Sequence, residues 1–285
     1  MNVVFLGDLS FLLLSKIEKL PARFRVWAPS VKYSRFLQYW LGLAPEQVHI
    51  LPRSIFFKAQ PRVKVDFDSF VFAGRASLST KRVRLAVQLV ERLRHVSKKN
   101  YEFHICNTGQ VSRDQVVKLF PRTRYPWIHY HFSLNRSWPQ NFLSAAYLSL
   151  SHYEFEDLGI APCEAISAGM PCILSDWGGY SDFDLPSVLK LPTLQSWTKA
   201  GERRYVIQLT KNVLDFIEQI RQGVIQTPPE ACSFKELIGN QQSNLTFSAI
   251  VLARLRKGGL PRPPGLHEEK RIPGVRHEMM ASYFR

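Results

Sequence analysis

Two acidic residues have the types and spacing that could bind an activated sugar. Glu156 and Glu164 are separated by seven residues, and a helix is predicted to begin between them, near Ile160–Ala161. The free backbone N–H groups at that helix start, around Gly159 to Ala161, would bind a phosphate. Glu164 is expected in the first turn of the helix, where its carboxylate suits the hydroxyl groups of a ribose or sugar. Spacing alone supports equally well a simpler interpretation, in which Glu164 offsets the helix dipole and Glu156 is solvated.

The elements around these carboxylates predict a parallel α/β unit. A strand at 147–150 precedes an acidic loop, and the helix that follows has Pro162 in its first turn and ends at Gly169. A second strand at 171–174 leads into the turn Gly178–Gly179. Parallel sheets bind ligands at the carboxyl ends of their strands, so both loops are expected at the binding edge.

A second phosphate-binding layout lies upstream. The buried strand predicted at 70–75 ends in Gly74 and Arg75, and a helix is predicted from Lys81 to about residue 95. Its apolar residues form one stripe, which fits a helix packed on a sheet. Strand, glycine, cation and helix start in this order would bind phosphate through Arg75 and Lys81. The alternative for either cation is a solvated surface charge.

Together these residues resemble the retaining glycosyltransferases of family 4, whose GT-B fold pairs two Rossmann-like domains around a nucleotide-sugar cleft. The E-x7-E motif of that family falls on Glu156 and Glu164, and its phosphate-binding loop falls on Gly159–Ile160. A second family motif, a serine–glycine–glycine turn ending in glutamate, falls on Ser175, Gly178, Gly179 and Asp182, where Asp replaces the usual Glu.

The resemblance implies roles for individual residues. Arg75 and Lys81 would bind the donor diphosphate, Glu164 the ribose, and Glu156 the transferred sugar near its reacting carbon. The turn that begins at His131 and Phe132 would cradle the nucleotide base. From the residues alone, alternation of His129 and His131 on one face of a strand is the preferred interpretation. Arg82 stands where the family commonly has glycine.

Three regions are expected along the chain. Residues 1–66 would be a partial N-terminal α/β domain and linker, 67–222 the Rossmann-like nucleotide-sugar domain with a parallel sheet, and 223–285 a C-terminal crossing helix and basic tail. The resemblance is firm from Phe70 to Asp182 and extends over roughly residues 24–220. The sequence shows no counterpart of three features of the family: the early glycine-rich loop, the acceptor-binding helices and the histidine that contacts the donor sugar.

Further elements are expected outside the motif segment. They are strands at 24–28, 48–52, 101–106, 127–132 and 187–191, and helices from Ser30 to Leu41 with Gly42 as the stop, at 112–120, from a Ser137 cap through Ala146, at 202–220 and at 244–255. The helix that ends at Leu41 could lie on a membrane surface, although core packing is favoured.

Composition restricts the partners. The formal charge is +15, from 38 Lys and Arg against 23 Asp and Glu, which favours phosphates, nucleic acid or an anionic membrane face. The four cysteines form no C-x-x-C pair, and Cys106 and Cys172 are expected as reduced core thiols of a cytoplasmic protein. The apolar N-terminal segments carry Asp8 and no preceding cation, which argues against a signal peptide or a membrane-spanning helix.

The resemblance implies a cytoplasmic, metal-independent hexosyltransferase of polysaccharide biosynthesis that acts at or near the inner face of the membrane. Its donor would be a UDP- or GDP-linked sugar, transferred with retention to a glycan, lipid or other hydroxyl, with a partner chain or oligomer supplying the missing part of the site. One alternative is a non-catalytic nucleotide-sugar-binding remnant or one subunit of a split glycosyltransferase. A nucleic-acid-binding protein is the weaker alternative, because the cations are spread along helices and tail without a recognised motif.

Overall fold

The computed structural model of the chain describes residues 2–5, 24–28, 30–50, 68–76, 81–107, 113–132, 138–142, 144–152, 159–194 and 198–225. The chain divides into two compact units, Met1–Ser54 with Lys235–Arg285, and Ile55–Phe234. The linker expected at 61–68 lies outside the described residues except for Asp68, and the helix expected at 244–255, the C-terminal tail and Glu156 also lie outside them.

The first unit contains a small parallel sheet in the order β1-β2-β3, formed by β1 (Asn2–Phe5), β2 (Phe24–Ala28) and β3 (Val48–Ile50). The helix α2 (Val31–Leu41) connects β2 to β3, and the 3-10 helix η1 (Pro45–Gln47) precedes β3.

Helix α2 begins and ends at the residues that the sequence indicated. The Ser30 side chain accepts a hydrogen bond from the backbone N–H of Tyr33 at 3.1 Å, and Gly42 has the left-handed φ of 59°. Tyr33 is buried, whereas Tyr39 is 54% exposed, so α2 packs one face inward. The strand, cap and stop expected between residues 24 and 42 are confirmed.

The second unit contains a six-stranded parallel sheet in the order β6-β5-β4-β7-β8-β9. The strands are β4 (Ser69–Gly74), β5 (Glu102–Asn107), β6 (Ile128–Phe132), β7 (Ala146–Ser149), β8 (Cys172–Ser175) and β9 (Val188–Leu191). The helices are α3 (Val83–Ser97), α4 (Arg113–Leu119), α5 (Ile160–Ser167) and α6 (Lys199–Arg221), with the 3-10 helices η3 (Trp138–Phe142) and η4 (Gly178–Asp182).

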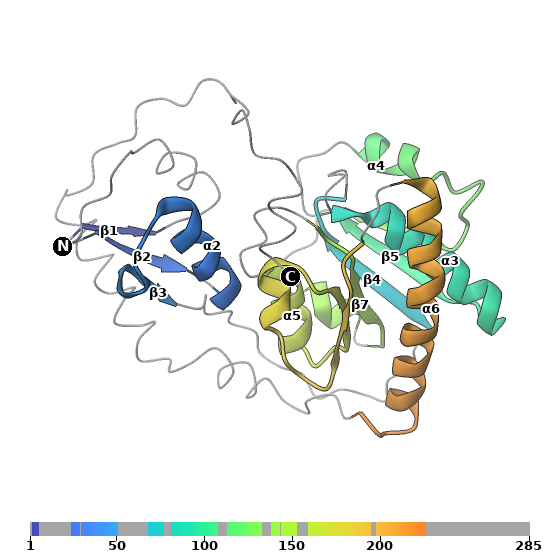
Figure 1. Cartoon of the computed structure of the whole chain (residues 1–285). Helices are drawn as coiled ribbons and strands as arrows, with labels where there is room; N and C mark the ends of the chain where they lie inside the picture. Colours follow the sequence, from blue (N-terminus) through green and yellow to red (C-terminus); the bar gives the residue numbers. More distant parts are fainter. Residues whose placement is uncertain are drawn as a thin grey trace. The chain divides into compact units, whose positions relative to one another are not determined.

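Helices cover the sheet on both faces. Figure 1 shows α3 and α6 together on one side of the strands and α5 on the other. The apolar stripe expected on α3 is buried and packs with α6 against β4, β5 and β7, so the prediction is confirmed. All four residues of β7 and of β8 are buried, as in a parallel sheet that is covered on both faces. The expected α/β Rossmann-like fold with a parallel sheet is therefore confirmed.

The helix expected from Ser137 through Ala146 is wrong. The structure has the short 3-10 helix η3, which ends at Phe142, and Ala146 already belongs to β7. Trp138 and Phe142 are both buried, and the N–H of Ala145 bonds to the carbonyl of Phe142 at 2.9 Å. Ala146 pairs with Phe70 of β4 in the sheet, so a helix cannot extend through it.

Cys106, Cys163 and Cys172 are buried and none of the three forms a disulfide, and burial raises the pKa of the Cys106 thiol to about 12. The Cys106 thiol therefore remains protonated and behaves as a small apolar group. Within the described ranges, no helix combines the length and apolar character needed to cross a membrane.

Candidate functional site

The strand order of the sheet reverses between β4 and β7. The chain moves from β4 outward to β5 and β6, then returns to the other side of β4 to form β7, β8 and β9. In open parallel sheets, ligands bind at the carboxyl ends of the strands where the strand order reverses in this way. The segments that follow β4, β7 and β8 therefore meet at the expected binding edge.

The segment after β4 carries two of the predicted phosphate-binding cations. Gly74 ends the strand with a φ of 155°, a conformation that L side chains rarely adopt, and Arg75 follows it as an exposed residue. Lys81 is half-buried and lies two residues before α3. Arg82 caps α3 with a left-handed φ of 52°, at the position where the family that the sequence resembles commonly has glycine. The backbone there keeps a conformation that suits glycine although the side chain is arginine.

The segments after β7 and β8 are in direct contact. Gly159 caps α5 with a φ of 80°, and a Cβ atom there would lie 2.2 Å from Cε1 of Tyr180. Tyr180 belongs to η4, where Gly178 and Gly179 are buried beside it. The Tyr180 hydroxyl lies 3.3 Å from the Ser149 hydroxyl at the end of β7. Gly159 is therefore required for close packing, and both predicted glycine loops lie at one edge.

Helix α5 begins at Ile160, as predicted, and Ile160 is exposed whereas Ala161 is half-buried. Glu164 is the fifth residue of α5, so the expectation that it lies in the first turn is wrong. The left-handed Gly159 immediately before Ile160 sets this start.

Glu164 lies below the loop surface. It is 8% exposed, and its Oε2 accepts a hydrogen bond of 2.6 Å from the indole Nε1 of Trp138. A charge-assisted bond of this kind contributes about 1.5–3 kcal/mol and fixes the orientation of the carboxylate. The indole thus positions Glu164 beside the start of α5. Nothing in the local sequence signals this bond, because Trp138 precedes Glu164 by 26 residues.

Sequence reasoning missed His152, which follows β7 at the same edge. It is 4% exposed, its Nδ1 donates to the Leu150 carbonyl at 2.9 Å, and its Nε2 accepts from the Leu194 N–H at 3.3 Å. Burial lowers the pKa of His152 from 6.5 to about 4; the charge of Arg82 adds to this decrease, and the bond to Leu150 opposes it. His152 is therefore neutral at pH 7 and ties β7 to the segment after β9.

His131 belongs to a cluster on one face of β5 and β6. Its Nε2 lies 3.0 Å from Nδ1 of His104, and the ring of His104 stacks on that of His129 at 5.0 Å. Burial, followed by the charges of His131 and His129, lowers the pKa of His104 to about 4. Burial, followed by the charge of His129, lowers the pKa of His131. The alternation of His129 and His131 on one face is confirmed.

The remaining residues of the serine–glycine–glycine turn are also part of the edge. The hydroxyl of Ser175, the last residue of β8, donates to the Ser151 carbonyl at 2.5 Å and ties the ends of β7 and β8 together. Asp182 ends η4 and is half-buried. Phe132 ends β6 with its ring stacked on that of Tyr130. Among the residues that the structure describes, no group of His, Cys, Asp or Glu side chains could hold a metal ion.

Comparison with protein families and solved structures identifies relatives of this arrangement. Residues 55–183 match the sequence profile of the family described as Glycosyl transferases group 1. No curated protein matches the sequence.

Several solved structures share the fold. Among them are the pneumococcal O-GlcNAc transferase GtfA in complex with UDP and GlcNAc (TM-score 0.59, 17% identity, 86% of this chain) and a GtfA/B complex (TM-score 0.55, 14% identity, 81% of this chain). HepE from Anabaena in complex with UDP and glucose is another (TM-score 0.63, 16% identity), with 86% of this chain aligned to 71% of HepE. The chain spans less than half of the length of the first two of these matched chains, 47% and 44%.

Proposed function

Because residues 55–183 match the family described as Glycosyl transferases group 1, we propose that the chain binds a nucleoside-diphosphate sugar and takes part in moving the sugar to an acceptor hydroxyl. The acceptor would be a glycan or a lipid, and transfer would proceed with retention at the reacting carbon. Residues 67–222 would form the donor-binding domain.

One observation supports this proposal: β4, β7 and β8 are parallel neighbours, so the segments after them leave the same edge of the sheet, where the strand order reverses. The segment after β4 has the cation Arg75, and the segment after β7 leads to the N–H groups at the start of α5. A diphosphate between them would be bound by charge from one strand and by backbone dipoles from the next. Glu164, held by Trp138, would accept hydrogen bonds from the ribose hydroxyls.

Three roles rest on the family resemblance. Lys81 would add a second cation to the diphosphate, and Glu156 would contact the transferred sugar. His131 and Phe132, at the end of β6, would adjoin the nucleotide base. Cations beside the departing diphosphate stabilise the charge that develops during transfer, which would make Arg75 and Lys81 catalytic as well as binding residues.

A second candidate function is donor binding without independent transfer, either as a remnant or as one subunit of a split transferase. This chain spans less than half of the length of the matched chains of GtfA and of the GtfA/B complex, which favours this second function. We therefore expect weak transfer, or none, from the isolated chain, and stronger transfer once a partner chain completes the acceptor side.

Calorimetric titration with UDP and GDP tests the donor site. Binding should occur without a divalent cation, and Arg75→Ala should weaken it at least about tenfold, or about 1.4 kcal/mol. Arg204→Ala, which removes an exposed arginine from α6, is the matched control and should bind as the parent does. Equal affinity of the Arg75 variant and the parent would refute the role of Arg75.

Glu164→Gln separates ribose binding from support of the loop. The amide oxygen of glutamine can still accept the Trp138 N–H, so the fold should be kept. UDP binding should weaken about tenfold while pyrophosphate binding barely changes, because only UDP presents ribose hydroxyls. Equal weakening for both ligands would mean that Glu164 only supports the phosphate loop.

Glu156→Ala tests catalysis. UDP binding should persist while sugar transfer from a labelled donor is lost, the pattern of a contact that matters mainly in the transition state. The assay is run with the chain alone and with cell extract. Robust transfer by the chain alone would refute the need for a partner, and donor binding without turnover in either condition would favour the non-catalytic remnant.

A further inference from the structure

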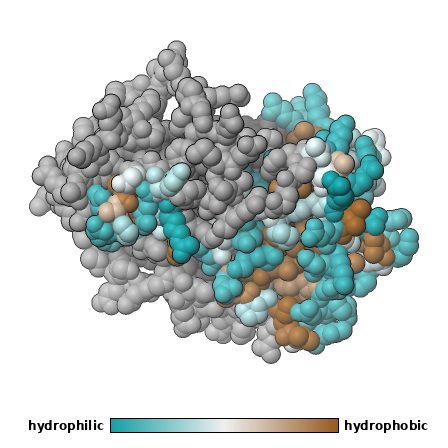
Figure 2. Space-filling model, viewed as in Figure 1, coloured by the Kyte–Doolittle hydropathy of each residue, from teal (hydrophilic) through white to brown (hydrophobic). Residues whose placement is uncertain are grey.

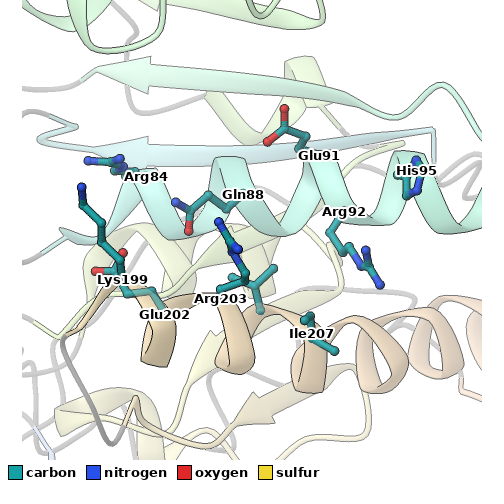
Figure 3. Close-up of a pocket in the computed structure, with 10 residues that line it drawn as sticks. Arg84, Gln88, Glu91, Arg92, His95, Lys199, Glu202, Arg203 and Ile207 are labelled. Atoms are coloured by element: carbon teal, nitrogen blue, oxygen red, sulfur yellow. The ribbon is translucent and has the colours of Figure 1, made fainter.

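A basic groove lies on the outer surface of the second unit, between α3 and α6. Its volume is about 480 Å³, and Figure 3 shows the side chains along its two walls. The cationic or ionisable basic side chains are Arg84, Arg92 and His95 on α3 and Lys199 and Arg203 on α6. Arg92 points from α3 toward α6, and Arg203 points from α6 toward α3.

The charge of the groove is not balanced by its own residues. Two carboxylates, Glu91 and Glu202, line it against four permanent cations, and Glu91 points away from α6 (Figure 3). In the part of the chain that the structure describes, the side chains of Arg84, Arg92, Lys199 and Arg203 make no hydrogen bond or ion pair. The four cations therefore repel one another and would be stabilised by an anionic occupant.

An apolar strip accompanies the charges. Among the lining residues, Val206 is buried, and Ile207 beside it is 49% exposed. Figure 2 shows hydrophilic side chains over much of this side of the molecule, with apolar patches between them. The groove thus combines cationic walls with a small apolar contact.

The shape and lining distinguish among anionic occupants. A bilayer is flat on the scale of two helices and cannot enter the groove, and one exposed isoleucine gives little insertion into lipid. Single-stranded nucleic acid is held by stacking on aromatic side chains, and among the residues that the structure describes, no Trp, Tyr or Phe lines the groove. Acidic peptides are recognised by clusters of arginine, with a side-chain pocket for an apolar residue.

We infer that this groove binds an acidic segment of a partner protein that also carries an apolar side chain. From Arg84 to His95 the α3 wall covers three turns, about 16 Å. That length matches about five residues of extended peptide. Glutamate or aspartate side chains would pair with Arg92 and Arg203 across the groove, and the apolar residue would cover Ile207.

Fluorescence anisotropy on the full chain tests the proposal, with a labelled glutamate-rich peptide that carries a central leucine, at about 0.15 M ionic strength. The parent should bind, and Arg92→Ser with Arg203→Ser should weaken binding at least about tenfold. The control pair is Arg204→Ser with Lys211→Ser, which removes the same charge from exposed positions of α6 outside the groove and should weaken binding less than about twofold. Replacing the central leucine with serine should also weaken binding.

The proposal is overturned if the parent does not bind the peptide, or if both double variants lose the same peptide affinity. It is also overturned if the groove variant keeps its peptide affinity but no longer binds phosphatidylserine vesicles, a result that would assign the groove to a membrane. Circular dichroism and UDP titration verify that the variants are folded. If the first groove variant misfolds, Arg84→Ser with Lys199→Ser makes the same comparison.

Discussion

At the carboxyl edge of the six-stranded sheet, the side chains of Glu164 and His152 are buried and hydrogen-bonded, whereas in the groove between α3 and α6 the arginine side chains are exposed and make no hydrogen bond to any residue that the structure describes. Glu164 is held by Trp138, and His152 uses both of its ring nitrogens. Arg92 and Arg203, by contrast, project from exposed helix faces. The buried side chains of the edge therefore contribute to folding, and disrupting their packing should change stability, while substitutions in the groove should change binding with little effect on stability.

The largest effect on stability is expected at Gly159. Gly159→Ala would place a Cβ atom 2.2 Å from the Tyr180 ring and 2.9 Å from Pro162 Cγ, at a φ of 80°. Overpacking and left-handed strain together should lower the free energy of unfolding by about 3 kcal/mol or more. Urea unfolding followed by tryptophan fluorescence measures the change.

Gly223→Ala is the matched control for that substitution. Gly223 has a φ of 72°, and no described atom lies within 4 Å of the position that a Cβ atom would take there. Only the backbone strain therefore applies, about 1 kcal/mol. Similar losses in the two variants would show that the loops after β7 and β8 do not need to pack so closely.

Acid should destabilise the edge through His152. The pKa of His152 is about 4 in the folded chain and about 6.5 when unfolded, so the unfolded state binds the proton more tightly. The stability that neutral His152 contributes is present above pH 6.5 and is lost as the pH falls toward 4, by up to about 3 kcal/mol. His104 has the same direction and the same pH window.

His152→Gln should flatten the dependence of the unfolding free energy on pH between 6.5 and 4, measured by urea unfolding at a series of pH values. His95→Gln, which replaces an exposed histidine of the groove, should leave that dependence unchanged. If the two variants have the same pH dependence, the acid sensitivity does not come from the buried edge.

Local signals in the sequence were sufficient for much of this edge. Glycine and cap residues define helix ends through a few neighbouring residues, which is why the start of α5 after Gly159 and the bounds of α2 could be predicted. Buried apolar runs likewise identified β4 and β8. The family match at 55–183 confirmed the resemblance read from the motifs.

Contacts between distant residues could not be predicted in this way. The Trp138–Glu164 bond joins η3 to α5. The helix expected after Ser137 does not form through Ala146, because Ala146 pairs in the sheet as part of β7. The groove joins cations on two helices more than a hundred positions apart, and each helix alone has only an ordinary charged face. The sequence cannot show that these faces share a groove until the packing of α3 on α6 is known.

Arg82 connects the two regions, because it precedes α3 and its charge reaches His152. Arg82→Gly should be more stable than Arg82→Ala by about 1 kcal/mol, since glycine adopts the φ of 52° without the steric cost that alanine carries. Both variants remove the guanidinium, so the difference between them isolates the backbone, and urea unfolding measures it. Equal stability would mean that the left-handed conformation at this position is not retained.

The smallest effect on stability is expected in the groove itself. Arg92→Ser with Arg203→Ser should change the free energy of unfolding by no more than about 0.5 kcal/mol, because both side chains are exposed and outside the core. The sign should depend on salt. Mutual repulsion among the groove cations is screened as ionic strength rises, so the parent should gain stability with salt more than this double variant does.

Arg204→Ser with Lys211→Ser removes the same net charge and should keep more of the salt response of the parent. Unfolding in urea at low and high salt measures the salt response of the parent and of the two double variants. If the groove variant responds to salt as the parent does, the groove cations do not act on one another. The contrast with the buried edge would then rest on exposure alone.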